Sequence, residues 1–202
     1  MTLLHIDASI LNDQSASRRL TAAIVKRLTE ARPGIRVIRT DLAAEPVDHL
    51  STAEFLAFQG VQPEDDATKG AVARNARLLE DFLAADIVVV GAPMYNFGVP
   101  SQLKAWIDRL AVAGKTFRYT EKGAEGLAGG KKVIVASSRG GFYGPQTPIA
   151  FLDHQETYLR NIFGFFGITD ITFVRAEGLA LGEDARKSAI ASAEAQVEKL
   201  AA

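Results

Sequence analysis

Residues 87–110 read IVVVGAPMYNFGVPSQLKAWIDRL, and this stretch decides the fold. Its first four apolar residues predict a buried parallel strand. A helix is predicted to open at Pro100-Ser101, because Leu103, Ile107 and Leu110 recur at helical spacing. The loop between strand and helix is too apolar and aromatic for ordinary surface. In open α/β sheets, ligands bind at the carboxyl ends of strands, where this loop is expected to lie.

The side chains of this loop suggest a ligand. Tyr95 and Phe97 offer flat apolar faces, while Asn96 and the backbone amides around Gly98 offer hydrogen bonds. This combination suits a flat heteroaromatic ring with polar edges, such as a flavin. Packing of a helix onto the sheet would use the same aromatic residues, so the loop alone leaves both interpretations open.

Strand-like and helix-like segments alternate along the chain. Strands are predicted at Leu3–Asp7, Ile35–Thr40, Asp86–Gly91, Lys132–Ser137 and Asp170–Arg175. Helices are predicted around residues 20–28, 72–83, 101–110, 147–164 and 183–200. This alternation predicts a doubly wound α/β fold, in which helices cover both faces of a parallel sheet. We expect one domain over residues 1–202.

Composition excludes several classes of function. The 23 basic and 24 acidic side chains leave a net charge of −1, which gives no electrostatic basis for binding nucleic acid or a membrane surface. The chain has no cysteine, so disulfides, thiol nucleophiles and thiolate metal sites are excluded. Its three histidines show no ligand spacing. Because Met1 leads directly into a strand rather than a signal peptide, we expect a cytoplasmic, metal-free protein.

A serine-rich loop follows the first strand. Ser9, Ser15 and Ser17 are small hydroxyl donors near a helix N-terminus, where free amides and the helix dipole favour a phosphate. Ser15 or Ser17 could instead serve only as the N-cap, because capping uses the same geometry. Arg18 and Arg19 are expected to face solvent. The loop lacks the glycine fingerprint of dinucleotide sites and the chain lacks a Walker-type lysine, which disfavours both of those classes.

A third loop with ligand chemistry follows the fourth strand. It contains Ser138-Arg139-Gly140-Gly141, and paired glycines at the end of a strand let the backbone approach a ligand and donate amides to it. The other glycine-rich segment, Gly123–Gly130, precedes the fourth strand, so we interpret it as a flexible turn at the opposite end of the sheet.

Several conspicuous side chains are interpreted as structural. His5 lies within the first strand and Trp106 within the third helix, where both are expected to pack in or near the core. Asp153 and Glu156 share a helical face but show no partner that would make an acid–base pair.

The loop and helix at residues 91–109 closely resemble the NAD(P)H-dependent FMN azoreductases and quinone reductases, which have a flavodoxin-like fold. The resemblance runs over nearly all of the chain and implies five parallel strands in the order 2-1-3-4-5. It also implies one tightly bound FMN per chain. The residues implied to bind FMN are Ser9, Ser15, Ala16, Ser17, Pro93, Met94, Tyr95, Asn96, Phe97, Gly98, Ser138, Arg139, Gly140 and Gly141. Tyr119 is implied to line the substrate pocket with Asn96 and Phe97.

The activity that the resemblance implies is two-electron reduction of quinones and aromatic azo compounds by NADH or NADPH. Hydride would pass to flavin N5, and the acceptor would then replace the nicotinamide in one shared pocket, which predicts ping-pong kinetics. Because the flavin carries the chemistry, no catalytic side chain is expected. The sequence assigns no side chain to the 2′-position of the donor, so NADH and NADPH both stay open.

The resemblance also implies a homodimer whose partner chain helps close the pocket. Two connections are unusually long, Ala43–Glu64 and Ala113–Lys131, and long connections in compact domains are often functional or interfacial. The second suits a substrate pocket. The first holds a short apolar helix at Phe55–Phe58, interpreted as a dimer contact, with packing inside one chain as the alternative.

Two other functions compete with the reductase. A flavodoxin-type electron carrier would bind FMN without turnover, but such carriers are commonly strongly acidic and this chain is near neutral. A flavin-free α/β protein that binds another phosphate ligand would use the serine loop. It would leave the Met94–Gly98 and Ser138–Gly141 loops unexplained.

Overall fold

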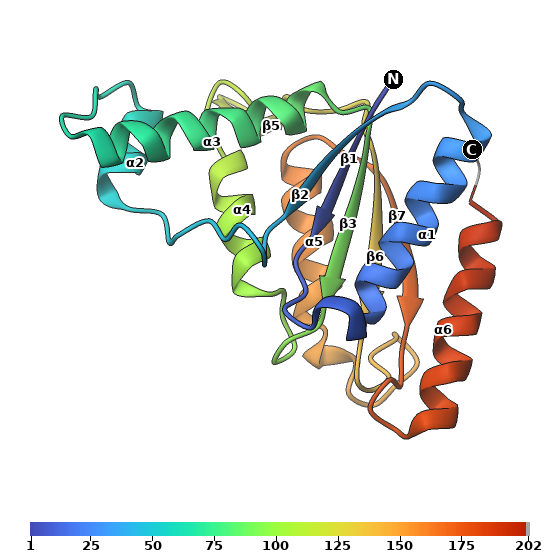
Figure 1. Cartoon of the computed structure of the whole chain (residues 1–202). Coiled ribbons are helices and arrows are strands. Elements are labelled where there is room, and N and C mark those ends of the chain that lie inside the picture. The colour runs from blue at the N-terminus through green and yellow to red at the C-terminus, as the bar shows by residue number, and fades with distance from the viewer. Residues whose placement is uncertain (201–202) are drawn as a thin grey trace.

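A computed structural model describes residues 1–200, in which five parallel strands form one sheet between two layers of helices (Figure 1). The order of the sheet is β2-β1-β3-β6-β7. Its strands are β1 (Thr2–Asp7), β2 (Arg36–Asp41), β3 (Ile87–Pro93), β6 (Lys132–Ser138) and β7 (Asp170–Ala176). The helices are α1 (Ala16–Ala31), α2 (Thr52–Phe58), α3 (Asp66–Ala84), α4 (Ser101–Leu110), α5 (His154–Phe165) and α6 (Glu183–Glu198), with 3-10 turns at Asn12–Gln14 and Ala150–Leu152. The predicted parallel α/β class is confirmed.

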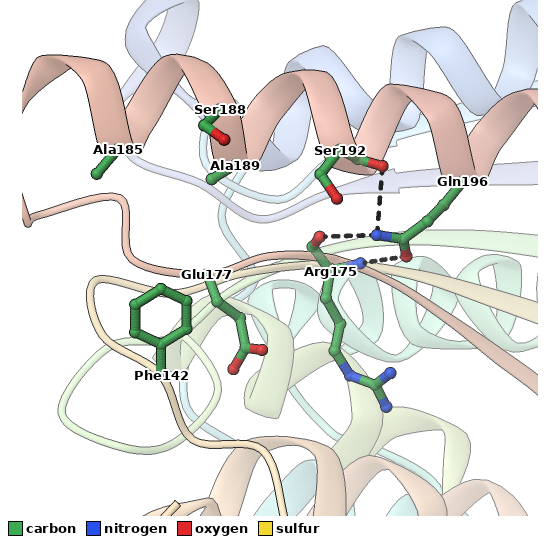
Figure 2. A pocket seen from close by; sticks show the side chains of 8 residues that line it. All are labelled: Phe142, Arg175, Glu177, Ala185, Ser188, Ala189, Ser192 and Gln196. Atoms are coloured by element: carbon green, nitrogen blue, oxygen red, sulfur yellow. Dashed lines mark hydrogen bonds between the residues drawn. The ribbon is translucent and has the colours of Figure 1, made fainter. Parts of the chain in front are cut away.

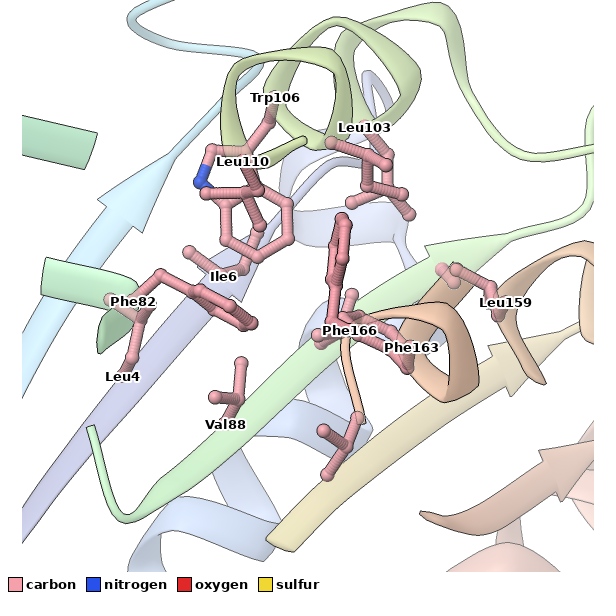
Figure 3. Close-up of a cluster of buried hydrophobic side chains, with 14 of the residues drawn as sticks. Leu4, Ile6, Phe82, Val88, Leu103, Trp106, Leu110, Leu159, Phe163 and Phe166 are labelled. Atoms are coloured by element: carbon pink, nitrogen blue, oxygen red, sulfur yellow. The ribbon is translucent and has the colours of Figure 1, made fainter. Parts of the chain in front are cut away.

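The two faces of the sheet are buried by different helices. Successive residues of β3 alternate between the two cores, as a pleated strand requires: Val88 packs under α3, α4 and α5, while Val89 packs under α1 and α6. Figure 3 shows the first core, in which the rings of Phe82 and Trp106 meet edge to face with centroids 5.9 Å apart. Trp106 is fully buried, as predicted. Because helices bury both faces of the sheet, loops that could bind a ligand lie at the ends of its strands.

A small antiparallel hairpin, β4 (Phe117–Thr120) and β5 (Gly123–Gly126), was not predicted. It overlaps the segment that the sequence predicted as a flexible turn. Because its strands count as β4 and β5 in chain order, the last two strands of the main sheet are β6 and β7, and the order reads 2-1-3-6-7. A Cβ atom at Gly126 would come within 2.1 Å of the amide nitrogen of Gly167. Glycine is therefore needed there because β5 lies directly against the turn between α5 and β7.

Two predicted helix boundaries are wrong. The fourth helical pattern was expected to start near Thr147, but α5 begins at His154, because the Asp153 side chain caps it by accepting from the amide of Glu156 at 2.9 Å. The last helix ends at Glu198 rather than Leu200. Residues 201–202 of the predicted domain lie outside the described residues.

The described residues also bear on membranes and metals. Within residues 1–200, the helices are too short or too polar to cross a bilayer. Within the same range, His, Cys, Asp and Glu side chains form no group of three or more that could hold a metal ion.

A buried ion pair ties helix α2 to α3 and α4. Arg109 donates to Glu54 Oε1 at 3.0 Å and to Asn75 Oδ1 at 2.9 Å, and Asn75 also donates to Glu54 Oε1 at 2.9 Å. Burial alone would raise the pKa of Glu54, but hydrogen bonds from Asn75 and Ser51, together with the Arg109 charge, lower that pKa to about 2. Phe58 packs against the core, whereas Phe55 remains 51% exposed. Packing inside one chain therefore accounts for only part of this apolar helix.

Replacing Glu54 by alanine should lower the free energy of unfolding by about 3 kcal/mol, because the change leaves the fully buried Arg109 charge without its partner. Urea unfolding at neutral pH measures this loss. In the wild-type protein, the folded-state pKa of Glu54 lies below its ordinary value of 4.5, so the stabilisation is present above pH 4.5 and declines as the pH falls toward 2.

The matched control for this prediction is Glu30→Ala, which removes the exposed ion pair between Glu30 and Lys26 on α1. This change should leave the free energy of unfolding nearly unchanged. An equal loss from both variants would contradict a special role for the buried pair.

Candidate functional site

Loops after four strands enclose one cavity of about 220 Å³ at the carboxyl edge of the sheet, which we call the edge cavity. The loops after β1, β3 and β6 supply the predicted cofactor residues that line it: Ser9, Ser15, Ala16, Pro93, Met94, Tyr95, Ser138, Arg139 and Gly140. Parallel pairing explains the convergence, because Pro93 lies opposite Ser138 and the amide of Met94 donates to the Ser138 carbonyl at 2.8 Å. Sequence reasoning missed the other lining residues, Leu11, Gln14, Leu179, Ala180 and Arg186.

The remaining predicted residues lie nearby but outside this cavity. Asn96 and Gly98 line a larger neighbouring cavity of about 650 Å³, which we call the outer cavity. Tyr95 lines both cavities, so the turn that contains it stands between them. Ser17, Phe97 and Gly141 line neither.

The serine loop combines helix capping with a cluster of hydroxyl groups. Ser15 is the N-cap of α1, and its hydroxyl accepts from the amide of Arg18 at 3.2 Å. The Ser15 and Ser17 hydroxyl oxygens lie 3.1 Å apart, and the Ser9 hydroxyl lies 3.3 Å from that of Tyr95. The first amides of α1 have no partner inside the helix, as at every helix N-terminus. Because Ala16 lines the edge cavity, these amide donors stand beside it.

Arg18 does not face solvent, contrary to expectation. Its guanidinium donates to both carboxylate oxygens of Asp41, at 2.6 and 2.7 Å, and to the Ser9 carbonyl at 2.9 Å. The hydrogen bonds that Arg18 donates to Asp41, together with those from the backbone amides of Ala43 and Ala44, lower the pKa of Asp41 to about 2. Asp41 ends β2, so only the pairing of β2 with β1 brings it to Arg18. The side chain of Arg18 thus fixes the serine loop and leaves no free charge there. Arg19 does face solvent, where it pairs with Glu194.

The turn at Tyr95–Gly98 has a strained backbone. The amides and carbonyls of Tyr95 and Gly98 bond to each other at 3.1 and 3.0 Å, so Asn96 and Phe97 form a two-residue turn. Both have left-handed backbones, with φ of 49° and 68°. Asparagine tolerates this conformation, but the second position of such turns ordinarily holds glycine. Backbone strain of this kind is concentrated at functional sites.

Neighbouring residues hold Phe97 in its strained conformation. Its ring packs edge to face against Tyr143, with centroids 6.0 Å apart. Its carbonyl accepts from the amide of His154, the first residue of α5, at 3.1 Å. The turn is therefore fixed both by the third loop and by a helix N-terminus.

The Arg139 side chain is buried in an ion cluster beneath the third loop. Its guanidinium contacts Glu156 and lies 3.0 Å from Asp153 and 3.4 Å from Glu177. Arg175 donates to the same Glu156 at 2.7 and 2.8 Å. Asp153 and Glu156 pair with Arg139, and Glu156 also pairs with Arg175, because β6 and β7 bring both arginines to α5. A guanidinium stays protonated and makes no acid–base pair, so these contacts agree with the structural interpretation of both carboxylates. The guanidinium of Arg139 is therefore held by carboxylates beneath the third loop.

Hydrogen bonds fix the glycine loop with its carbonyls turned to the protein. The carbonyls of Arg139, Gly140 and Gly141 accept from the amides of Leu179, Ala180 and Gly178 at 3.0 to 3.1 Å. Within residues 1–200, the amides of Gly140 and Gly141 donate to no protein acceptor. The loop therefore has two backbone amides without a protein acceptor, and Gly140 lines the edge cavity.

Gln155, which sequence reasoning missed, locks two strand ends together. It donates to the Ala92 carbonyl of β3 at 2.8 Å and accepts from the Ser137 hydroxyl of β6 at 3.0 Å. Arg139 in turn donates to Ser137 at 3.0 Å. Gln155 lies far from both strands in sequence and carries no motif, so no local signal could have identified it.

A separate hollow of about 420 Å³ lies between α6 and β7 (Figure 2). Gln196 of α6 exchanges two hydrogen bonds, both 3.3 Å, with the backbone of Arg175, and so covers the exposed edge of β7. The charged residues that line this hollow, Arg175 and Glu177, already pair with Glu156 and Arg139. None of the predicted site residues lines it, so we do not consider it the functional site.

Tyr119 lies away from both cavities within one chain. It belongs to β4, is 76% exposed and packs against Phe117. The hairpin lies at the amino edge of the sheet, at the end of α5 opposite to the edge cavity (Figure 1). The amide of Ala128, just after β5, donates to Phe166 at that same end. The expectation that Tyr119 lines a pocket with Asn96 and Phe97 is therefore not met within a single chain.

Known proteins resemble the whole of this chain. A family model described as a flavodoxin-like fold matches residues 1–201. An FMN-dependent NADH:quinone oxidoreductase of Sinorhizobium fredii is 60% identical over 96% of this chain and 94% of its own length. A protein of the same name from a Bradyrhizobium species is 57% identical over the full length of both chains. The crystal structure of an FMN-dependent NADH-azoreductase from Bacillus anthracis in complex with FMN superposes with a TM-score of 0.89, at 26% identity, covering 98% of this chain and 96% of that one.

Two substitutions of Phe97 test the strained turn. Phe97→Ala and Phe97→Gly both remove the ring, but only alanine keeps a Cβ atom in the left-handed region. We expect the glycine variant to be the more stable of the two by about 1 kcal/mol in urea unfolding. The same pair of changes at Phe142, which lies outside the left-handed region, should give the opposite order, because alanine restricts the unfolded chain more than glycine does. An alanine variant as stable as the glycine variant at position 97 would contradict the strain.

Proposed function

The chain belongs to the family with the flavodoxin-like fold whose model matches residues 1–201, and on that premise we propose that it is an FMN-dependent NADH:quinone oxidoreductase that also reduces aromatic azo compounds. The names of its relatives support this activity, and they name NADH as the donor. The observation on this chain that carries the proposal is the convergence of three predicted loops on one cavity.

The residues around the edge cavity fit the two chemically different ends of FMN. The phosphate would accept hydrogen bonds from the hydroxyl groups of Ser9 and Ser15 and from the first amides of α1, which are donors suited to an anion. The isoalloxazine ring would lie against the Met94–Phe97 loop. Its pyrimidine edge would accept hydrogen bonds from the free amides of Gly140 and Gly141. When bound, FMN supplies the redox chemistry, accepting hydride from NADH and giving two electrons to the acceptor.

The protein contributes position and electrostatics. Amide donors at Gly140 and Gly141 favour negative charge on a bound ring, and their carbonyl bonds to residues 178–180 fix them before the ligand arrives. The strained turn fixes Asn96 beside the outer cavity, where we propose that donor and acceptor bind in turn. The net reaction consumes NADH, one proton and a quinone and yields NAD⁺ and a hydroquinone, and in this scheme solvent supplies the proton.

Spectroscopy of the FMN-loaded protein tests the activity. With oxygen excluded, NADH should bleach the flavin absorbance rapidly, and a benzoquinone should restore it. Steady-state rates should give parallel double-reciprocal lines, because donor and acceptor share one pocket. Tight binding of FMN without bleaching by either NADH or NADPH would contradict the proposal and favour an electron carrier.

We further propose that the active form is a homodimer of single-domain chains in the cytoplasm. Apolar side chains are exposed around α2 at Phe55, Leu56 and Val61. The side chain of Tyr119 is exposed on β4. A second copy of the chain would bury such residues. In this proposal Tyr119 reaches a substrate pocket from the partner chain, which reconciles its implied role with its distance from the edge cavity.

Sedimentation velocity tests the dimer. The wild-type protein should sediment at twice the mass of the chain, and Phe55→Asp should shift it toward the monomer, because a charge would be buried at the interface. Val37→Asp introduces the same charge at an exposed apolar position of β2 and should leave the dimer intact. A monomeric wild-type protein would contradict the proposal.

A further inference from the structure

Arg186 carries a positive charge at a position of helix α6 where the helix does not stabilise it. It lies four residues into α6, near the helix N-terminus, where the dipole disfavours positive charge. The acidic Glu183 and Asp184 occupy the first turn, as that dipole favours. Within residues 1–200, Arg186 forms no ion pair, whereas the neighbouring Lys187 pairs with Glu183 at 2.6 Å. The charge of Arg186 is therefore not neutralised by the protein.

The guanidinium of Arg186 reaches the serine loop. Its Nη2 donates to the carbonyl of Gln14 at 2.8 Å, and Gln14 immediately precedes the helix N-cap Ser15. Arg186 lines the edge cavity together with Gln14, Ser15 and Ala16. A guanidinium has five N–H donors, and this contact uses one of them. The others remain for a ligand in the cavity.

The serine loop otherwise offers only neutral donors to a phosphate. It contains no lysine, and Arg18 is committed to Asp41. A phosphate monoester carries a charge of about −1.5 to −2 at neutral pH. Hydrogen bonds between ionised partners are roughly twice as strong as those between neutral groups. An arginine without an ion-pair partner, beside these hydroxyl groups and amides, supplies the positive charge that the loop lacks.

We propose that Arg186 binds the phosphate of FMN, supplying from helix α6 the positive charge that the serine loop does not contain. This inference rests on the proposed function, and it assigns to the chain a phosphate contact that no sequence motif marks. A phosphate monoester also occurs on NADPH as its 2′-phosphate. Because Arg186 lies next to the α1 N-terminus, the structure favours the FMN phosphate.

Binding of FMN and riboflavin to the FMN-free chain separates the phosphate contact from all others. Flavin fluorescence quenching gives both dissociation constants. Arg186→Gln should raise the dissociation constant of FMN about tenfold and change that of riboflavin by less than about twofold, because riboflavin lacks the phosphate. Arg186→Lys should recover part of the FMN affinity. The difference between wild type and Arg186→Gln should shrink as salt is added.

Lys187→Gln is the matched control, because it removes the same charge from the adjacent position of α6 but does not line the edge cavity. It should leave both dissociation constants within about twofold of wild type, since a solvent-exposed charge is screened.

Three results would overturn the assignment, and a fourth would overturn the proposed function on which it rests. Equal weakening of FMN and riboflavin would show that Arg186 only tethers the serine loop through Gln14. Unchanged FMN affinity with a raised KM for NADPH, but not for NADH, would assign the arginine to the donor phosphate. A wild-type chain that binds neither flavin would overturn the proposed function itself, and a wild-type chain that binds both flavins equally would overturn only the phosphate contact.

Discussion

Parallel pairing is the constraint on which the rest of this structure depends. Five strands that run in one direction all end at one edge, so the loops after β1, β3 and β6 meet there although they lie far apart in sequence. Helices cover both faces, which leaves that edge as the place where backbone amides and polar side chains can meet a ligand. The edge cavity follows from this arrangement.

The backbone of the site is held from beneath by buried polar side chains. Gln155 joins the ends of β3 and β6, and Arg139 joins β6 to the N-terminal end of α5 and to Glu177. Arg18 joins the serine loop to the end of β2. These hydrogen bonds hold amides and a strained turn in place before any ligand binds. Pre-organisation of this kind lowers the cost of binding and suits a protein whose cofactor carries the chemistry.

Local patterns predicted the elements, and only tertiary contacts reveal what the charged residues do. The apolar run before Gly91 and the spacing of Leu103, Ile107 and Leu110 were sufficient for β3 and α4. Arg18 looks like an ordinary surface residue in sequence, and the resemblance assigns Arg139 to the cofactor. The ion-pair partners of both lie on other strands and helices, so no local pattern reveals them. The β4–β5 hairpin escaped prediction because Gly126 allows a close approach to Gly167, and such an approach has no signature in the sequence. Arg186 escaped for the same reason, since α6 meets the serine loop only in the folded chain.

Hydrogen–deuterium exchange of the FMN-free chain, titrated with FMN, tests most directly the claim that three loops form one binding site. We expect residues 8–17, 93–98 and 138–141 to gain protection together, along a single binding curve. Protection confined to residues 8–17 would contradict it, because the other two loops would then take no part in binding the ring.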